Sequence, residues 1–351
     1  MLTPDARWTP ERARAWYRDV VPLQGCNYVP SAAVNSLDMW QRFDAPLIDC
    51  ELALAADLGM NSLRVFLHDL AHASDPPTFL RRVDAFLTVC QRRGLRPIFV
   101  LFDDCWDAPA PGPQPAPLPG VHNSRWIQSP GVAAADDPGE RPRLRAYVRD
   151  VVRAFGRDER VLAWDVYNEV TNFFLRHLAR AEPMKSLGLV STMVRRRLGD
   201  LPTLALAEEA CTWVRDESPL QPLTLASWYS EPWLNERLYA WSDVISFHSY
   251  EDPSVVAAQI GALRAYDRPI LCTEWLSRPA GSTVEGVLPV LRKHNVASYN
   301  WGLVDGATQT KYGWGDDGGE AGEPQPWFSD LLRADGTPYR AAEAALLRAG
   351  R

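Results

Sequence analysis

The stretch Val161-Leu-Ala-Trp-Asp-Val-Tyr-Asn-Glu-Val170 begins as an apolar run and then presents Asn168 and Glu169. A short, near-continuous apolar run is typical of a parallel strand that is covered on both faces. We therefore expect a buried strand over residues 161–166. Residues 270–273 form a second apolar run, and a glutamate follows it in the same way. The sequence thus predicts buried parallel strands that carry carboxyl groups at their carboxyl ends.

Six further runs of this kind complete a set of eight. They lie at residues 23–28, 62–67, 97–102, 222–227, 244–247 and 297–301. Helical patterns are expected at 10–19, 45–58, 77–93, 143–155, 172–215 (broken near Pro183 and Pro202) and 341–348. Alternation of strands with longer helical segments is the signature of βα units. We predict an α/β fold, a single (β/α)8 TIM barrel.

An open, doubly wound sheet is the competing architecture. It usually carries a Gly-rich turn after its first strand, and here that position reads Asn27-Tyr-Val-Pro-Ser31. We therefore favour the barrel, with one catalytic domain over residues 1–351. Residues 107–142 are rich in proline, which does not fit inside helices or central strands, so they are expected to form an extended loop after the third strand. The pattern at 172–215 predicts a helical insertion after the fourth strand.

The composition narrows the range of partners. The net charge is −7 and no Lys/Arg stripe runs along any segment, which argues against nucleic acid. No apolar stretch approaches the ~20 residues that span a bilayer, so no membrane partner is expected. Residues 1–8 lack the pattern of a secretory signal. The six cysteines are scattered without a C-x-x-C pair, which favours reduced thiols and a cytoplasmic location.

Polar and aromatic side chains follow nearly every predicted strand, and in a (β/α)8 barrel this is the end at which the active site forms. The chain also has 14 Trp, whose flat faces suit the C–H faces of sugar rings. Filling of a large core is the alternative use of these tryptophans. The candidate substrate-binding residues are Asn27, Arg64, Asp103, Asp104, Trp106, Asn168, Trp228, His248, Tyr250, Trp275 and Trp301.

Two glutamates are the candidate catalytic residues. Glu169 follows the fourth strand and Glu274 the seventh, and these strands lie roughly across an eight-stranded barrel from each other. Two carboxyl groups about 5–5.5 Å apart form the geometry of a retaining glycosidase. One must be protonated to assist the leaving oxygen, and the other must be ionised to attack the anomeric carbon. A structural ion pair or a strand-end cap is the alternative role for either residue alone.

These motifs resemble the clan A glycoside hydrolases, most closely family 5 of the cellulase/mannanase type. The resemblance covers most of the chain and assigns the acid/base to Glu169 and the nucleophile to Glu274. The matching residues are Asn168-Glu169, Glu274, Arg64 within Asn61-Ser-Leu-Arg-Val-Phe66, His248-Ser-Tyr250 and Trp301.

The resemblance also implies roles for the neighbouring residues. Asn168 would hold the sugar 2-hydroxyl, Arg64 and Tyr250 would orient the nucleophile, and Trp301 would floor the −1 subsite. The chain departs from the family where Val170 replaces the usual Pro after the acid/base. It also departs at Asp103-Asp104-Cys-Trp106, where many members carry His-Asn. The mechanism carries over, whereas the sugar specificity does not.

No metal or cofactor is expected. His68 and His72 have i, i+4 spacing, but no third ligand for zinc lies near them in the sequence. Asp316 and Asp317 lie in a Gly-rich loop at 313–322, where a solvated acidic turn is favoured over a Ca²⁺ site. His68, His122 and Asn123 are further candidates for contacts at the rim of the site.

The leading hypothesis is a retaining glycoside hydrolase that cleaves a β-linked oligosaccharide or glycoside. Transglycosylation at the same site and a furanosidase specificity are open alternatives. A non-catalytic carbohydrate-binding barrel would predict the loss of one catalytic glutamate, and both are present. The sequence leaves open the sugar and its linkage, endo or exo action, and the oligomeric state.

Overall fold

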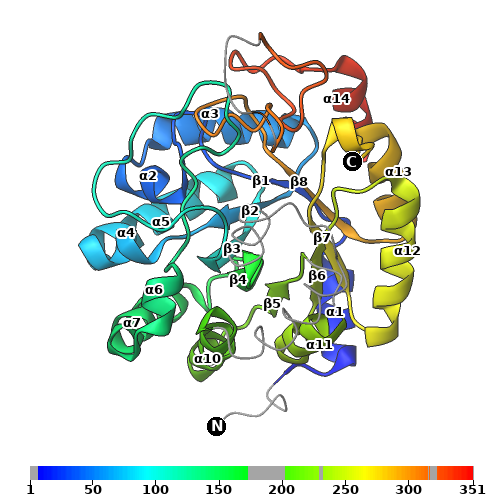
Figure 1. Ribbon diagram of the computed structural model, residues 1–351. Helices are drawn as coiled ribbons and strands as arrows, with labels where there is room; N and C mark the ends of the chain where they lie inside the picture. The colour runs from blue at the N-terminus through cyan, green and yellow to red at the C-terminus, as the bar shows by residue number, and fades with distance from the viewer. Residues whose placement is uncertain (1–6, 173–201, 229–231, 315, 317–321, 351) are drawn as a thin grey trace, which may run out of the picture.

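The computed structural model describes residues 7–172, 202–228, 232–314, 316 and 322–350 (Figure 1). Its eight parallel strands form one sheet in the order β5-β4-β3-β2-β1-β8-β7-β6. The strands are β1 (Gln24–Asn27), β2 (Ser62–Phe66), β3 (Arg96–Asp103), β4 (Ala163–Asn168), β5 (Leu223–Ala226), β6 (Ile245–His248), β7 (Ile270–Glu274) and β8 (Ala297–Trp301).

Backbone bonds join the two outer strands of this order and close the sheet into a barrel. Ser227, directly after β5, forms a parallel bridge with Phe247 of β6. The Ser227 carbonyl accepts a hydrogen bond from His248 N at 2.8 Å. The prediction of a (β/α)8 barrel is therefore confirmed.

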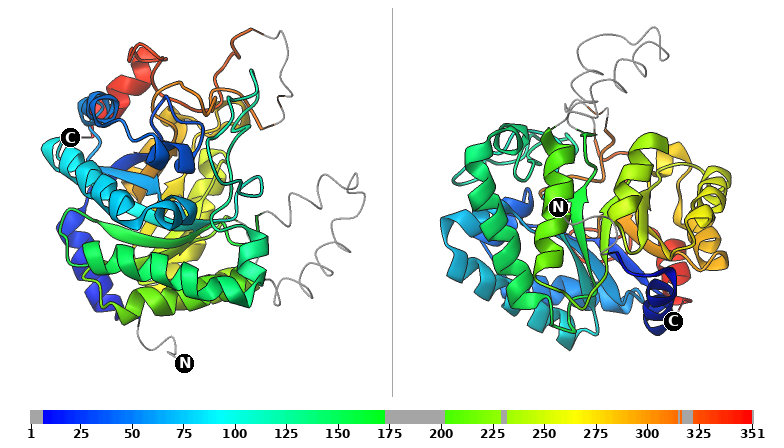
Figure 2. Two further views of the ribbon diagram at one scale, coloured as in Figure 1. Left: turned by 90° about the vertical axis from the view of Figure 1, so that its left-hand side faces the viewer. Right: turned by 90° about the horizontal axis from the view of Figure 1, so that it is seen from below.

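The helices surround the strands (Figures 1 and 2). None of those in the described part of the chain is long and apolar enough to cross a membrane. They are α1 (Pro10–Val20), α2 (Ser36–Gln41), α3 (Ala45–Asp57), α4 (Asp69–Ser74), α5 (Pro76–Arg92), α6 (Val132–Asp136), α7 (Arg141–Phe155), α10 (Pro202–Asp216), α11 (Pro232–Trp241), α12 (Pro253–Leu263), α13 (Val284–Lys293) and α14 (Ala341–Arg348), with 3-10 turns at Pro138–Glu140, Arg264–Tyr266 and Arg278–Ala280.

Helix α5 shows how the sequence sets these elements. Asp75 caps the helix by accepting a hydrogen bond from Thr78 N at 3.0 Å, and prolines occupy the first turn, where no backbone donor is needed. The helix ends just before Gly94, whose φ of +69° suits glycine. Its apolar face, which includes the buried Phe86, packs into the main core.

Helix α1 packs at the amino-terminal end of the barrel, opposite the strand ends that carry the candidate site. The Tyr17 hydroxyl donates to Asn295 O at 3.0 Å, and Trp8 N donates to Asp243 at 2.7 Å, next to the starts of β8 and β6. Trp8 and Tyr17 share an apolar cluster with the first residues of several strands, including Ala163 and Ala297.

Three sequence expectations need correction or fall outside the described residues. Strand β4 spans Ala163–Asn168, so it begins and ends two residues later than expected and includes Asn168. The Pro-rich segment is not loop throughout, because α6 and a 3-10 turn lie within it and α7 begins at Arg141, with Pro142 in its first turn. Proline is tolerated there because a first-turn residue has no intrahelical bond to donate. Most of the expected insertion, residues 173–201, lies outside the described part.

All six cysteines are unpaired.

Candidate active site

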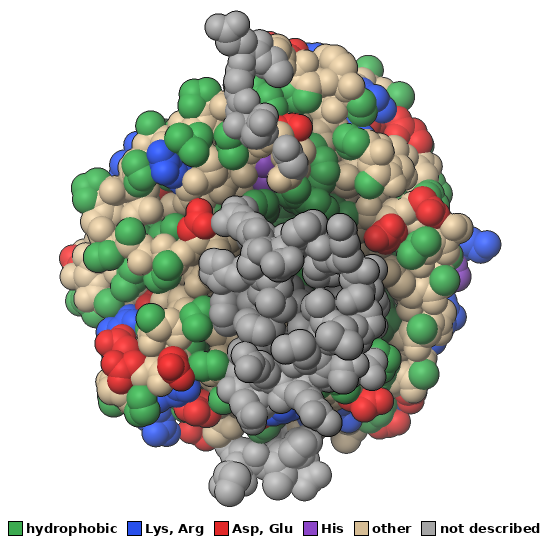
Figure 3. All heavy atoms as spheres, in the orientation of Figure 1, with side chains coloured by type: hydrophobic (Ala, Val, Ile, Leu, Met, Phe, Trp, Pro, Cys, Tyr) green, Lys and Arg blue, Asp and Glu red, His purple; other side chains and the backbone are tan. Residues whose placement is uncertain are grey.

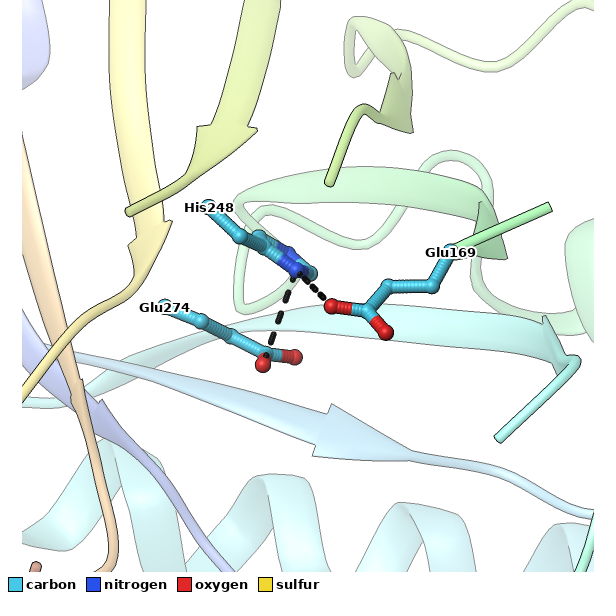
Figure 4. Close-up of side chains that lie close together, drawn as sticks. All are labelled: Glu169, His248 and Glu274. Atoms are coloured by element: carbon cyan, nitrogen blue, oxygen red, sulfur yellow. Dashed lines mark hydrogen bonds and ion pairs between the residues drawn. The ribbon is translucent and has the colours of Figure 1, made fainter. Parts of the chain in front are cut away.

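The two candidate catalytic carboxyl groups face each other at the carboxyl end of the barrel. Glu169 follows β4 directly and Glu274 is the last residue of β7. Both are buried. One carboxylate oxygen from each and one ring nitrogen of His248 all lie within 4.8 Å of one another (Figure 4). The barrel therefore places together the two residues that the sequence singled out.

The turn that carries Glu169 is held in an unusual backbone conformation. Glu169 has a φ of +45° and Thr171 a φ of +80°, in the left-handed region that non-glycine residues rarely adopt. Asp104 stabilises this turn, since its carboxylate accepts from Thr171 N at 2.7 Å and from the Tyr167 hydroxyl at 2.7 Å. Burial raises the pKa of Asp104 to about 7. Asp104 has no exposed surface and cannot contact a sugar, so its predicted binding role is replaced by support of the turn.

Arg64 is the cation at the centre of the site. Its Nη1 donates to Glu274 Oε1 at 2.7 Å, and its Nε and Nη2 donate to Asp165 Oδ2 at 3.0 and 2.7 Å. It also binds Asn168 Oδ1 at 2.6 Å and Asn27 Oδ1 at 2.9 Å. Arg64 is fully buried, so it acts on substrate only through these groups. The sequence did not point to Asp165, which lies inside the expected strand.

The environments of the two glutamates differ. Burial raises the pKa of both carboxyl groups. Glu274 contacts the Arg64 guanidinium, and it accepts a hydrogen bond from the Tyr250 hydroxyl at 2.8 Å. An adjacent cation favours the ionised form of a carboxyl group. Glu169 contacts no cation among the described residues, so its ionised form lacks the stabilisation that Arg64 gives Glu274.

His248 lies between the two carboxyl groups (Figure 4). Its Nδ1 is 2.6 Å from Glu169 Oε1 and 3.5 Å from Glu274 Oε2. Burial lowers the pKa of His248 to about 4, so the ring is neutral at neutral pH. A neutral ring either donates from Nδ1 to an ionised Glu169 or accepts from a protonated one. This contact lets His248 hold Glu169 in both protonation states.

The sequence did not identify Cys105 as a site residue. Its thiol donates to Glu169 Oε2 at 3.1 Å, and Asn168 Nδ2 lies 3.3 Å from its sulfur. Asp103 lies next to Cys105 and Asn168. Its carboxylate accepts hydrogen bonds from Asn168 Nδ2 at 2.8 Å and from the Trp126 indole at 2.7 Å. Burial raises the pKa of Asp103 to about 6. Asn172 Nδ2 is a further unforeseen donor to Glu169 Oε2, at 2.5 Å.

Aromatic side chains border the site, and hydrophobic groups gather between the two grey segments of Figure 3. Trp301 is partly exposed and packs edge-on against Phe66 and Trp126, with ring centroids 5.8 and 5.6 Å apart. Trp314, which the sequence did not single out, is 51% exposed and packs on Tyr250 at 4.9 Å.

Three other tryptophans that were predicted to contact sugar have different outcomes. Trp275 is fully buried and its indole donates to Ser298 Oγ at 3.1 Å, so its predicted contact with sugar is wrong. Successive residues of a strand point to opposite faces, and Glu274 takes the inward direction. Trp228 and Trp106 are partly exposed, with Trp228 donating to Val170 O at 3.1 Å beside the acid/base turn.

The weaker candidates have structural partners. His68 caps α4 by accepting from Leu70 N at 3.2 Å, and His72 Nε2 lies 3.1 Å from Asp150 Oδ2. His122 Nδ1 lies 2.7 Å from Tyr312 O, and Asn123 N donates to Thr308 O at 2.8 Å. Asp316 caps a turn at Gly313 N, and Asp317 lies outside the described residues.

Within the described residues, Glu169, His248 and Glu274 are the one group whose ligand atoms are close enough to hold a metal ion. Their proximity is already explained without an ion. An ion pair joins Glu274 to Arg64, and a hydrogen bond joins Glu169 to His248.

No protein-family model and no curated protein matches the sequence. Solved structures of similar fold include the exo-β-1,4-mannosidase Op5Man5 from Opitutaceae bacterium strain TAV5, with a TM-score of 0.59 and 18% identity over 93% of this chain. The match spans 59% of that structure's own chain. A GH5_18 protein from Streptomyces cattleya, bound to Manβ1-4GlcNAc, has a TM-score of 0.58 and 17% identity, covering 94% of this chain and 80% of that chain.

A β-glucuronidase from Bacteroides uniformis has a TM-score of 0.61 and 14% identity, covering 94% of this chain and 35% of that chain. At such low identity these likenesses establish the fold. The chain has a (β/α)8 barrel fold like that of these structures.

Proposed function

We propose that this chain is a retaining glycoside hydrolase that cleaves a β-linked glycoside, with residues 1–351 acting as one catalytic unit. The observation that carries the proposal is the pair Glu169 and Glu274, whose oxygens approach within 4.8 Å from opposite sides of the barrel. In inverting enzymes the carboxyl groups are about 6.5–9.5 Å apart, which leaves room for a water molecule. The closer spacing suits direct attack by one carboxylate.

The first step uses the two glutamates in different protonation states. Protonated Glu169 gives its proton to the glycosidic oxygen, and the bond from that oxygen to the anomeric carbon breaks. The Glu274 carboxylate attacks the same carbon from the opposite face and forms a glycosyl ester. Arg64 keeps Glu274 ionised before the attack, because the guanidinium stabilises its negative charge.

The second step reverses the roles. Glu169, now ionised, takes a proton from water, and the water oxygen attacks the anomeric carbon. The ester bond breaks and Glu274 leaves as a carboxylate beside Arg64. Two inversions give net retention of configuration. An acceptor sugar in place of water would give transglycosylation, which product analysis with added acceptor detects.

The neighbouring structures suggest which sugars to test first. Two of them are named for β-mannosidase activity or bound to a β-mannoside, and a third is a β-glucuronidase. We therefore place β-mannosides first, followed by β-glucosides, β-glucuronides and arabinofuranosides.

The test is a panel of aryl glycosides with the variants Glu169→Ala and Glu274→Ala, and with Glu285→Ala as a control on the exposed face of α13. One aryl β-glycoside should be hydrolysed with retention, and both active-site variants should lose this activity. Azide should rescue Glu274→Ala and yield the glycosyl azide of inverted configuration. A fully active Glu274→Ala variant would refute the nucleophile, and inverted product from the wild type would refute the mechanism.

A further inference from the structure

The loops that follow β3 and β8 are bonded to each other by the side chain of Gln309. Its Nε2 donates to Leu118 O at 2.7 Å and Val121 O at 3.2 Å, and its Oε1 accepts from Gly120 N at 2.9 Å. Two bonds already described join the same loops. Asn123 N donates to the Thr308 carbonyl, and the His122 ring contacts the Tyr312 carbonyl. We call residues 118–123 and 308–312 together the clasp.

The order of the strands fixes where the clasp lies. Strands β2 and β1 separate β3 from β8 on the shorter way round the barrel, and bonds to the loop after β1 place the clasp on this side. The loop after β1 is bonded to both partners, through Ala307 N to Ser31 O at 2.7 Å and Asn35 Nδ2 to Arg125 O at 2.6 Å. The two long loops run side by side in Figure 1 and in the left view of Figure 2. Three loops that are bonded to one another therefore lie on this side of the barrel mouth.

Residues adjoining the clasp reach the candidate site itself. Trp126, which follows the β3 half, packs on Trp301, and Trp314, which follows the β8 half, packs on Tyr250. The His122 ring joins the halves, with centroids 5.7 Å from Trp106 and 6.5 Å from Trp314. The side that carries the clasp therefore begins directly at the nucleophile and its aromatic neighbour.

The positions of the two glutamates orient the substrate. Glu169 must reach the glycosidic oxygen, so the leaving group departs on the side of β4. The glycone then occupies the remaining side, over Trp301 and the ends of β8 and β1. From this arrangement we infer that the clasp ends the substrate site after a single sugar, so that the enzyme removes one residue at a time from the non-reducing end. The inference rests on the proposed retaining glycosidase function and adds that the enzyme acts from the chain end and not within the chain.

The test compares 4-nitrophenyl β-trisaccharides of the mannose and glucose series with the same compounds capped at the non-reducing sugar by a benzylidene group. The wild type should release single sugars from the uncapped compound of the series it accepts. Because the cap would collide with the clasp, the capped compound should be cleaved at least about 100-fold more slowly than the uncapped one. This is the size of effect that misplacement by ~1 Å produces. Cleavage of both at similar rates, or release of a disaccharide from the uncapped compound, would overturn the inference.

A variant of the clasp provides the second measurement. Gln309 has a φ of +55°, and Asn tolerates this region well, so Gln309→Asn shortens the side chain without backbone strain. The ratio of capped to uncapped cleavage should rise several-fold, whereas Gln91→Asn on the exposed face of α5 should leave it unchanged. An unchanged ratio in a Gln309→Asn variant with lowered melting temperature would show that the clasp does not limit the site. If simple aryl monoglycosides are not hydrolysed either, the proposed function itself fails, and this inference fails with it.

Discussion

Replacing Cys105 should change the pH dependence of catalysis, because its thiol is a hydrogen-bond donor to the acid/base. The Sγ–Oε2 distance to Glu169 is 3.1 Å. Burial and the charges of Asp103, Glu169 and Glu274 raise the pKa of the thiol well above its usual range. The sulfur therefore keeps its proton at any pH at which the enzyme works, and it donates to Glu169 throughout.

The size and the sign of the effect follow from this bond. A hydrogen bond to a charged group contributes about 1.5 kcal/mol, and 1.36 kcal/mol corresponds to about one pKa unit. Burial raises the pKa of Glu169, and the Cys105 thiol is the largest influence that lowers it. Cys105→Ala should therefore raise the pKa of Glu169 further, by roughly one unit. A general acid must be protonated, so the alkaline limb of kcat/KM should move to higher pH by that amount.

The assay is the pH profile of hydrolysis of the best aryl glycoside by wild type, Cys105→Ala and Cys105→Ser. Serine keeps a donor, so its alkaline limb should stay near that of the wild type. The alanine variant should also deglycosylate more slowly near neutral pH, because less of Glu169 is ionised to act as base. An alkaline limb that does not move in Cys105→Ala, or one that moves equally in Cys105→Ser, would refute this account of the thiol.

Three other substitutions test the site and its surroundings. Tyr250→Phe removes a donor to Glu274, which should raise the pKa of the nucleophile and move the acid limb of the kcat/KM profile to higher pH. Arg278→Met removes the buried ion-pair partner of Glu343 and leaves it only the partly exposed Arg340 at 3.7 Å, so urea denaturation should show a loss of about 3 kcal/mol in the free energy of unfolding. Trp275→Phe should lower the melting temperature but leave KM for the aryl glycoside unchanged; a raised KM would restore Trp275 to the sugar site.

The fold was predictable because its signal is local. Each strand is an apolar run of a few residues, and the residue at the end of a parallel strand must lie at the same end of the barrel as its counterparts. This reasoning placed Glu169 and Glu274 correctly at the carboxyl end. It could not tell which way a side chain points at the next position. Trp275 and Asp104 therefore face away from the pocket, although each follows a residue that faces into it.

The loops carried the features that the sequence could not predict. Gln309 and Trp314 have neither periodicity nor a strand end to mark them, and Cys105 follows a strand end but is not a residue type that marks a sugar site. Their positions depend on contacts between segments that are far apart along the chain, such as the Gln309 bonds to Leu118 and Val121. Cys105 lay within Asp103-Asp104-Cys-Trp106, the place where the chain departs from the family pattern, and this departure was the available signal.

The charges around Arg64 explain why Glu169 can lose its proton as Glu274 becomes an ester in the proposed reaction. The one guanidinium contacts two buried carboxylates, Asp165 and Glu274, so this part of the site is already one negative charge in excess. Ionising Glu169 as well would add a second buried charge, which no cation of the described residues contacts and which is costly. Glu169 is therefore held protonated while Glu274 is free. Formation of the glycosyl ester removes the charge of Glu274, and the Arg64 charge is then balanced by Asp165 alone. Glu169 can ionise at that point, which is when the second step requires a base.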